Sequence, residues 1–526
     1  MPNASTTTDG SAGLPRPARV EPVALSELIA QPERGPIGVL SGPDVAVTGI
    51  TAGTAFVRAG DLFAGLPGRT AHGASFAAQA VASGAVAVVT DESGRALVPD
   101  GVPVLVVPNV RDELGWISSR VYAHPSQRVN VLGVTGTSGK TTTTFLMEAG
   151  LRAAGRRTGL IGTVATHIAG TEIKTGFTTP EAPELQALLA VMRERGVSDV
   201  AMEVSSHALS LGRVSGTSFR AAGFTNLSED HLDFHASMGD YFRAKVKLFD
   251  PWYTERPVVV VDDQWGNMLV DILGPCVTVS AQDNPRGTWQ ALDVQELADG
   301  TTAFRVIGPR FWPGGTGTRP AIELEMSCAI PGRYNIANVL LALALLYEDD
   351  IEPNVVAEAI SSASVPGRME RIDAGQPFLA VVDYSHKPAA VDGALRALRP
   401  LTRGRLIIVL GSGGDRDKGK RPHMGQIAAR GAELLVVTDD NPRSEDPADI
   451  RRAMLGGALA VPASERGEVV EIGDRTEAIA YAIAAAGPGD TVLVAGKGHE
   501  TGQEIGGTVH PFDDRAVVRL ALGSWE

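Results

Sequence analysis

The stretch Gly133-Val-Thr-Gly-Thr-Ser-Gly-Lys-Thr-Thr142 decides how the middle of this chain folds. It follows the apolar run 129–132 and precedes helix-forming residues, which is the strand, loop and helix order of a phosphate-binding loop. Small residues let backbone N–H groups close around a polyphosphate, while Lys140 supplies a positive charge and Thr141 a hydroxyl for Mg2+. Val134 stands where the strict pattern has a glycine. The stretch predicts binding of nucleotide phosphates.

Composition limits the class of protein. The chain has 526 residues, 44% of them hydrophobic, which is enough for several cores and about three or four domains. A net charge of -14 disfavours nucleic-acid or anionic-membrane partners. No apolar run approaches the roughly 20 residues that span a bilayer, and only Cys276 and Cys328 could form disulfides. We expect a cytoplasmic protein with no membrane insertion and, at 1–20, a disordered tail rich in Ser, Thr, Gly and Pro.

Beyond that tail, the pattern of runs predicts three α/β domains. In 21–127, short strand-like runs alternate with alanine-rich helical stretches. In 128–363, continuous apolar runs end in polar clusters and alternate with helices, which indicates a mostly parallel sheet buried on both faces. The region 364–526 repeats that pattern. The fold class we predict is therefore α/β, with a small N-terminal domain, a central phosphate-loop domain with a mostly parallel sheet and a Rossmann-like C-terminal domain.

In the C-terminal region, four apolar runs are each followed by a polar cluster. Ligands of open α/β sheets bind at the carboxyl ends of the strands, so these clusters are expected to share one crevice. Arg416 stands where a dinucleotide-binding motif would have its third glycine, which argues against a dinucleotide. The clusters are 383–386, 411–416, 439–443 and 496–500.

Three side chains in the central region are candidates for a metal site. Glu203 ends an apolar run, where phosphate-loop enzymes commonly place a carboxylate for Mg2+, and a neutral His231 is an ordinary ligand beside it. Lys245 lies in an expected helix, and a lysine buried near metal and phosphates would have to lose its charge, for instance by chemical modification. The alternatives are a solvated strand-end glutamate, a loop histidine that caps the next segment and a solvated lysine.

Charges of both signs gather in the C-terminal clusters. A guanidinium fork binds a carboxylate at two points, and carboxylates hold ammonium groups, so the set suits a zwitterionic ligand. The Asn-Pro pair within Asp440 to Arg443 stiffens that backbone. A surface ion-pair network is the alternative. The charged residues are Arg416, Asp440, Arg443 and Glu500.

From about residue 45 onward, the chain resembles the Mur ligase family, and within it the members that add diaminopimelate. The likeness rests on ordered motifs, and the family's phosphate loop also lacks the glycine that Val134 replaces. Around 51–55 the chain departs from the family pattern. The motifs are Thr135–Thr141, Met202–Ala208, Asn226–Asp233, Gly332–Asn338, Pro366–Arg371, Gly414–Pro422, Asp440–Arg443 and Gly496–Glu500.

The resemblance implies that 21–127 binds the UDP substrate, that 128–363 is the ATPase domain and that 364–526 brings the amino acid. It also implies a role for each matching position. For ATP these are Thr135, Gly136, Thr137, Ser138, Gly139, Lys140, Thr141, Thr142, Asn335, Asn338 and His386. For UDP-N-acetylmuramoyl-L-alanyl-D-glutamate they are Thr54, Thr70, Thr178, Thr179, Ser205 and Arg213. For meso-diaminopimelate they are Arg416, Asp440, Asn441, Pro442, Arg443, Gly496 and Glu500. For Mg2+ they are Thr141, Glu203, His231 and Lys245, the last carbamylated to N6-carboxylysine.

The implied reaction is ATP-dependent amide formation through an acyl phosphate, in the synthesis of a peptidoglycan precursor. Arg416 and Arg443 suit diaminopimelate because it has a distal carboxylate that lysine lacks. The alternatives are a lysine-adding or folylpolyglutamate-type ligase of the same fold, and a nucleotide-binding switch without catalysis. A monomer is assumed.

Overall fold

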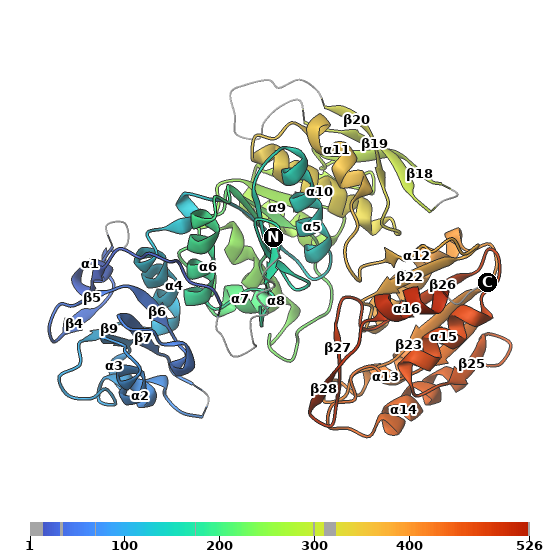
Figure 1. The fold of residues 1–526 in the computed structure, drawn as a ribbon. Coiled ribbons are helices and arrows are strands. Elements are labelled where there is room, and N and C mark those ends of the chain that lie inside the picture. Colours follow the sequence, from blue (N-terminus) through green and yellow to red (C-terminus); the bar gives the residue numbers. More distant parts are fainter. Residues whose placement is uncertain are drawn as a thin grey trace, which may run out of the picture.

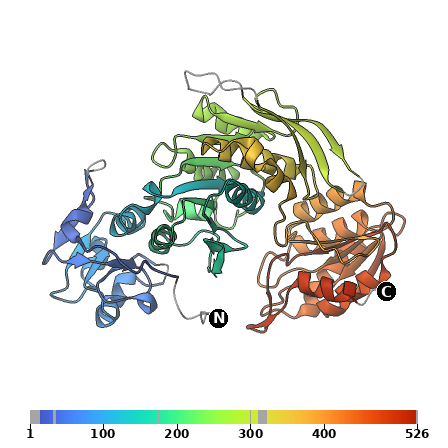
Figure 2. The same ribbon diagram turned by 45° about the horizontal axis from the view of Figure 1, so that its top comes forward.

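A computed structural model describes residues 14–31, 35–68, 70–173, 175–297, 300–309 and 322–523. Three α/β units follow one another along the chain, and the middle unit lies between the other two (Figures 1 and 2). Each unit is built on its own sheet, so the predicted α/β fold class is confirmed. The predicted domain boundaries at 127/128 and 363/364 fall in the connections between these sheets.

The N-terminal unit has a five-stranded sheet in the order β4-β9-β8-β7-β6, in which only β4 is antiparallel to its neighbour. Its strands are β1 (Val23–Ala24), β2 (Ala30–Gln31), β3 (Gly35–Pro36), β4 (Val39–Ser41), β5 (Ala46–Val47), β6 (Gly49–Thr51), β7 (Asp61–Gly65), β8 (Ala87–Thr90) and β9 (Val104–Val106). Its helices are α1 (Leu25–Ile29), α2 (Ala77–Ala82), α3 (Glu92–Arg95) and α4 (Val110–Val121).

The expected disordered tail at 1–20 can be compared with the structure only at residues 14–20. Residues 1–13 lie outside the described residues, but Arg16 donates to both carboxylate oxygens of buried Asp61, each at 2.7 Å. The backbone amides of Ala18 and Arg19 donate to Glu194. Low hydrophobicity predicted disorder here, whereas polar contacts anchor residues 14–20 instead.

The central unit is an eleven-stranded sheet in the order β13-β12-β11-β14-β10-β15-β16-β17-β18-β19-β20. The strands are β10 (Asn130–Thr135), β11 (Thr158–Ile161), β12 (Thr166–Ile168), β13 (Thr171–Ile173), β14 (Asp199–Glu203), β15 (Ala221–Phe224), β16 (Pro257–Val260), β17 (Val277–Ser280), β18 (Trp289–Glu296), β19 (Thr302–Ile307) and β20 (Glu323–Cys328). The helices are α5 (Lys140–Ala153), α6 (Ala182–Glu194), α7 (Ser206–Ser210), α8 (Met238–Val246), α9 (Gln264–Leu273), α10 (Tyr334–Glu348) and α11 (Pro353–Ser362).

The part of this sheet from β11 through β14, β10, β15, β16 and β17 to β18 is parallel, as predicted. Strands buried on both faces need apolar side chains throughout, and helices such as α5 and α10 supply the cover. Helix α10 is apolar almost all round because it packs against α5, α11 and the sheet. The antiparallel extensions β12–β13 and β19–β20 were not predicted.

The C-terminal unit is a six-stranded sheet in the order β21-β22-β26-β23-β24-β25, parallel except for β21, beside a β27–β28 hairpin. The strands are β21 (Glu370–Arg371), β22 (Leu379–Asp383), β23 (Leu406–Leu410), β24 (Leu434–Val437), β25 (Glu468–Glu471), β26 (Thr491–Ala495), β27 (Gly502–Ile505) and β28 (Thr508–Pro511). The helices are α12 (Pro388–Leu398), α13 (Lys420–Gly431), α14 (Pro447–Leu459), α15 (Arg475–Ala485) and α16 (Asp514–Gly523).

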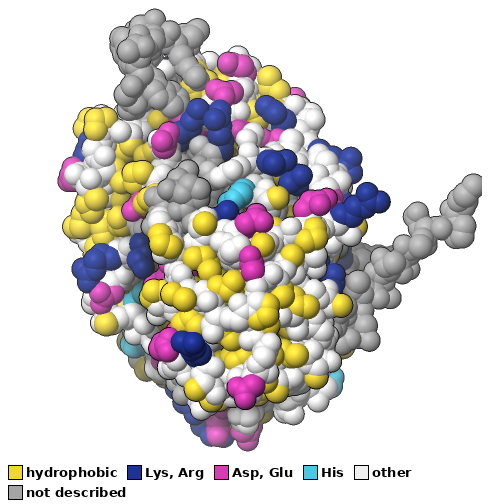
Figure 3. Space-filling model, turned by 90° about the vertical axis from the view of Figure 1, so that its left-hand side faces the viewer, with side chains coloured by type: hydrophobic (Ala, Val, Ile, Leu, Met, Phe, Trp, Pro, Cys, Tyr) yellow, Lys and Arg dark blue, Asp and Glu magenta, His cyan; other side chains and the backbone are white. Residues whose placement is uncertain are grey.

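The structure bears on the expectations about membrane insertion, cysteines and basic surface residues. Among the described helices, none is long and apolar enough to cross a membrane, and the cytoplasmic location stays a prediction. Cys276 and Cys328 are buried and unbridged, and burial raises the pKa of each thiol to about 11. On the face of the molecule at the N-terminal domain, basic side chains lie in small groups among acidic ones, without a stripe (Figure 3).

Candidate active site

The phosphate loop lies between β10 and α5, as the sequence predicts. Gly136 and Gly139 have positive φ angles of 147° and 90°. A Cβ at Gly136 would lie 1.8 Å from Thr225 Oγ1, and one at Gly139 would lie 2.4 Å from Asn338 Oδ1, so both positions require glycine. Val134 needs none, because it is a buried strand residue that pairs with Glu203 on β14.

Residues after β15 brace this loop. The Thr137 amide donates to the Asn226 carbonyl at 2.9 Å, and the Ser138 amide donates to Asn226 Oδ1 at 3.1 Å. Thr225 Oγ1 donates to the Ser138 carbonyl at 2.7 Å. Asn226 lies within one of the family motifs, but neither Asn226 nor Thr225 was predicted to have a role in the site. Their position after an apolar run was the available signal.

Lys140 begins α5 and folds back over the loop. Its Nζ donates to the carbonyls of Gly136 and Thr137 at 2.9 and 2.8 Å. Burial lowers the pKa of Lys140, and Glu203 and Asp230 oppose that shift. The ammonium therefore lies at the centre of the loop, where phosphate oxygens would replace carbonyls as its acceptors.

Glu203 ends β14 beside the loop and is almost fully buried. Its Oε1 accepts from Thr141 Oγ1 at 2.9 Å and from the Thr163 amide at 2.8 Å, and its Oε2 accepts from Thr163 Oγ1 at 3.0 Å. These donors are all neutral, so the carboxylate presents a negative charge to the phosphate loop. Thr163 follows β11 and was missed by sequence reasoning, since nothing in its local pattern marks it.

Four of the residues predicted to bind the UDP substrate lie together next to Glu203, and we call them the dipeptide cluster: Thr178, Thr179, Ser205 and Arg213. Thr163 Oγ1 is 2.9 Å from Thr178 Oγ1, and Thr179 Oγ1 donates to the Glu203 carbonyl at 2.9 Å. The Ser205 amide donates to Thr179 Oγ1 at 3.3 Å, while Ser205 Oγ caps α7. The carboxylate of Glu203 thus joins the phosphate loop to this threonine and serine cluster.

Arg213 extends the same cluster. Its Nη1 donates to the Thr179 carbonyl at 3.2 Å, its Nη2 lies 2.6 Å from Glu181 Oε1, and its guanidinium stacks 4.7 Å from the Phe177 ring centroid. In the described part of the chain, its buried Nε has no hydrogen-bond partner. The guanidinium is held from three sides and keeps one N–H to offer.

Lys245 on α8 is 1% exposed. Its Nζ donates to the Gly136 carbonyl at 2.7 Å and lies 4.4 Å from the centroid of the Tyr241 ring. No carboxylate of a described residue pairs with it. Burial, followed by the nearby Lys140, holds the pKa of Lys245 well below its ordinary value of 10.5. The side chain is therefore suited to be a neutral, nucleophilic amine.

His231 lies in the loop after β15 with a left-handed φ of 53°. Its ring is 4.8 Å from the ring of His207 and 6.1 Å from that of Tyr241, so it reaches the surroundings of Lys245. Burial lowers the pKa of His231 to about 4, which leaves a neutral imidazole at pH 7. The adjacent Asp230 forms an ion pair with Lys387 of the C-terminal unit.

The side chains around the phosphate loop suit Mg2+, which binds phosphate and water as well as protein. They do not suit a metal that only protein side chains coordinate. Within the described ranges, no group of three or more His, Cys, Asp or Glu side chains could form a cage. Mg2+ is usually held by one or two carboxylates together with phosphate oxygens and water. A buried carboxylate at Glu203, 2.9 Å from the Thr141 hydroxyl, meets that requirement. A positively charged ammonium at Lys245 could not be a ligand of Mg2+.

The residues predicted to contact the nucleotide come from two units. Asn338 Nδ2 donates to Asn335 Oδ1 at 2.9 Å on α10, and Asn338 Oδ1 faces Gly139 of the loop. His386 follows β22, and its Nδ1 lies 2.8 Å from the Tyr384 carbonyl, which assigns the proton to Nδ1 and leaves Nε2 as an acceptor. Burial lowers the pKa of His386 to about 4.

Two of the residues predicted to bind the UDP substrate lie in the N-terminal unit. Thr54 follows β6 and Thr70 follows β7, and these two strands are parallel neighbours. Both residues are therefore at the carboxyl end of the same sheet. Their role stays a prediction.

The C-terminal clusters meet at one edge of their sheet, as expected, since they follow adjacent parallel strands. Asn441 Nδ2 donates to Glu500 Oε2 at 2.9 Å. A Cβ at Gly496, where φ is 118°, would lie 2.5 Å from Asp440 Oδ2. That carboxylate oxygen is buried and has no hydrogen-bond partner among the described residues. It is available to a donor on a ligand.

Arg443 is fixed more firmly than the sequence suggested. Its Nε donates to Glu504 Oε2 at 3.2 Å and its Nη1 donates to the Gly414 carbonyl at 2.7 Å. Pro442 lies directly under Gly414, where a Cβ would approach its carbonyl to 1.9 Å. Arg416 is exposed and, within the described chain, forms no ion pair. The two arginines differ accordingly: Arg443 is held by two acceptors, whereas Arg416 is exposed.

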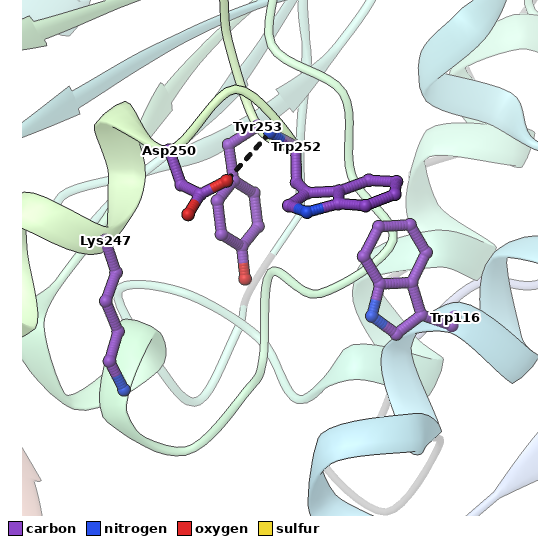
Figure 4. A pocket seen from close by; sticks show the side chains of 5 residues that line it. All are labelled: Trp116, Lys247, Asp250, Trp252 and Tyr253. Atoms are coloured by element: carbon purple, nitrogen blue, oxygen red, sulfur yellow. Dashed lines mark hydrogen bonds between the residues drawn. The ribbon is translucent and has the colours of Figure 1, made fainter. Parts of the chain in front are cut away.

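A separate pocket of about 270 Å3 is lined by Trp116, Lys247, Asp250, Trp252 and Tyr253 (Figure 4). The two tryptophan rings meet edge to face with centroids 6.2 Å apart. Tyr253 accepts from the amide of Phe219, just before β15 begins. The pocket therefore lies at the amino ends of the central strands, away from the phosphate loop at their carboxyl ends, and holds none of the predicted site residues.

Three family models match the chain: "Mur ligase family, catalytic domain" at 46–122, "Mur ligase middle domain" at 134–346 and "Mur ligase, glutamate ligase domain" at 367–498. The UDP-N-acetylmuramoyl-L-alanyl-D-glutamate–2,6-diaminopimelate ligase of Streptomyces avermitilis is 51% identical over 518 residues, which cover 97% of this chain and 98% of the relative. The ligase of the same name from Streptomyces coelicolor is 50% identical over 515 residues, with coverage of 97% and 98%. A solved structure of a ligase with this name aligns with a TM-score of 0.67 at 29% identity, over 96% of this chain and 99% of that one.

Proposed function

The chain belongs to the Mur ligase family of ATP-dependent ligases, and we propose that it joins meso-diaminopimelate to the D-glutamyl γ-carboxylate of UDP-N-acetylmuramoyl-L-alanyl-D-glutamate. One observation carries the assignment of the site. Thr163 Oγ1 bonds both Glu203, beside the phosphate loop, and Thr178, in the dipeptide cluster. A phosphate held by the loop and a carboxylate held by the cluster would therefore lie next to each other.

The first step makes the carboxylate reactive. A carboxylate is a poor electrophile because oxide is a poor leaving group. An oxygen of the γ-carboxylate attacks the γ-phosphorus of ATP, ADP leaves and an acyl phosphate forms. Lys140 neutralises charge on the transferring group, and the loop amides hold the phosphates in place. Arg213 would orient the dipeptide through its free Nε–H.

The second step forms the amide. An uncharged amine of diaminopimelate attacks the acyl carbon, and the tetrahedral intermediate expels phosphate, which takes the bonding pair and the former carboxylate oxygen. The attacking nitrogen loses one proton, which balances the charge of the departing phosphate, so the products are the amide and hydrogen phosphate. Asp440 and Glu500 would hold the ammonium groups of the ligand, and Arg443 a carboxylate.

Mg2+ would be held by Thr141 and Glu203, with His231 and a modified Lys245 as further ligands. When bound, it would supply positive charge to the phosphates. A neutral Lys245 amine can add to CO2, and loss of a proton then gives a carbamate anion. Because the pKa of Lys245 is lowered by burial, we propose that this lysine is carbamylated in the working enzyme.

Phosphate release tests the function. The purified protein is given ATP, Mg2+ and UDP-N-acetylmuramoyl-L-alanyl-D-glutamate, and either meso-diaminopimelate or L-lysine is added. We expect rapid release with diaminopimelate and little with lysine. Release with lysine alone would establish a lysine-adding ligase, and release with neither amino acid would favour a non-catalytic nucleotide-binding protein.

A further inference from the structure

Lys497, which follows β26, is 0% exposed and was given no role by the sequence. Its neighbours Gly496 and Gly498 have φ angles of 118° and 53°, values that allow the chain to turn the lysine inward. Its Nζ donates to Asn441 Oδ1 at 3.0 Å and to Glu500 Oε2 at 3.2 Å. The ammonium thus lies directly beneath two of the residues proposed to bind the amino acid.

Fold stability does not explain a lysine here. Removing an ammonium from water is costly, and replacing a buried ion pair by apolar groups of similar volume is often neutral or stabilising. The preceding strand β26 is buried throughout and apolar from Val492 to Ala495, so an apolar side chain would suit this position. The lysine must be useful for what it does to its two acceptors.

Lys497 determines which way the Asn441 amide faces. A lysine ammonium can only donate, so it must face Oδ1, which also accepts from the Glu504 amide at 3.0 Å. Nδ2 then has to point toward Glu500, and it donates to Oε2 at 2.9 Å. One oxygen of Glu500 is thereby fixed by two donors, while 32% of the side chain stays exposed.

We propose that Lys497 is a positioning residue of the amino-acid site: it fixes the Asn441 amide and the Glu500 carboxylate in the orientation that binds an ammonium group of the incoming amino acid. It acts through those two side chains and does not touch the ligand. The inference rests on the proposed function, because it assumes that Asn441 and Glu500 contact the amino acid.

The test compares Lys497→Met with the wild type and with Lys247→Met, which changes an exposed lysine of the central unit. Phosphate release gives kcat and the KM values for meso-diaminopimelate and ATP, and thermal melting gives stability. Loss of a charge-assisted contact predicts a diaminopimelate KM raised about 10- to 100-fold in Lys497→Met. The ATP KM and the melting temperature should stay close to wild type. Lys247→Met should match the wild type throughout.

A second variant separates positioning from general damage. Because Lys497 acts through Asn441 and Glu500, adding Lys497→Met to Glu500→Gln should raise the diaminopimelate KM by a smaller factor than adding it to the wild type. Independent, multiplying effects would overturn the proposal, as would a folded Lys497→Met with a wild-type diaminopimelate KM. If Lys497→Met does not fold, Lys497→Gln replaces it under the same criteria.

The wild-type control keeps the two proposals apart. A wild-type enzyme that uses L-lysine overturns the proposed amino-acid substrate, and the same KM comparison then tests Lys497 with L-lysine. A wild-type enzyme that uses no amino acid overturns both proposals.

Discussion

The phosphate site of the central unit and the amino-acid site of the C-terminal unit each contain a fully buried lysine, in opposite surroundings. Lys245 meets a backbone carbonyl and the face of Tyr241, with the positive Lys140 nearby. Lys497 meets the carboxylate of Glu500 and the amide oxygen of Asn441. Burial alone therefore does not determine what a lysine can do. The partner decides whether it is a candidate for modification or a fixed charge that orients its neighbours.

The largest effect should come from the third lysine of these sites. Lys140→Met removes the charge that faces the transferring phosphate, and we expect kcat to fall about 1,000-fold or more, with an unchanged melting temperature. Phosphate release under saturating substrates measures this. Lys247→Met is the matched surface control and should keep full activity. A Lys140→Met variant within tenfold of wild type would remove the phosphate loop from the account.

Two substitutions of Lys245 test whether the site requires a negative charge at this position or the lysine side chain itself. Lys245→Met should lower activity about 100-fold, because a proposed metal ligand is lost. Lys245→Glu provides a carboxylate from the same backbone position and should recover part of that loss. Steady-state phosphate release at several Mg2+ concentrations measures both variants. Equal activity in the two would contradict an anionic role for Lys245.

In the C-terminal unit, Arg443→Ala removes a guanidinium that Glu504 and Gly414 hold in place. We expect the meso-diaminopimelate KM to rise about 30-fold while the ATP KM stays within twofold. Arg452→Ala on α14 is the control, because Arg452 is exposed and forms an ion pair with Asp449, one turn earlier on the same helix. Initial rates at varied diaminopimelate decide the matter, and an unchanged KM would take Arg443 out of the amino-acid site.

The smallest effect concerns Asp349, a buried acid of the central unit. It lies beside a second carboxylate, Asp199, so its neighbour has the same charge, as Lys140 has for Lys245. Burial, with a hydrogen bond to Asp199, raises the pKa of Asp349 to about 7. The folded state then binds more protons than the unfolded chain between pH 3.8 and about 7. The free energy of unfolding should accordingly fall as pH rises through that window. The stability that protonated Asp349 contributes is fully present only below pH 3.8. Denaturant titrations at several pH values measure this.

Asp349→Asn provides the control for that titration. The amide does not ionise, so the variant should lose part of the decline in stability between pH 4 and pH 7. A decline identical to that of the wild type would show that other groups cause it.

Local sequence predicted the phosphate loop well, because Gly136, Gly139, Lys140 and Thr141 are neighbours whose spacing encodes their geometry. The C-terminal edge was predictable from apolar runs followed by polar clusters. Contacts between distant segments were not, and Thr163 shows why. It reaches Glu203 only because β11 and β14 pair. Lys497 lies inside the family motif Gly496–Glu500, but its inward direction depends on the φ angles of Gly496 and Gly498, which the sequence does not specify.

The central claim is that the phosphate loop phosphorylates the carboxylate of the dipeptide before the amine attacks. It is tested most directly with UDP-N-acetylmuramoyl-L-alanyl-D-glutamate carrying 18O in the γ-carboxylate. The enzyme is given ATP, Mg2+ and meso-diaminopimelate, and the released phosphate is analysed by mass spectrometry. The account predicts one 18O atom in each phosphate, because the acyl phosphate breaks at the carbon. Phosphate without 18O, alongside normal amide formation, would contradict it.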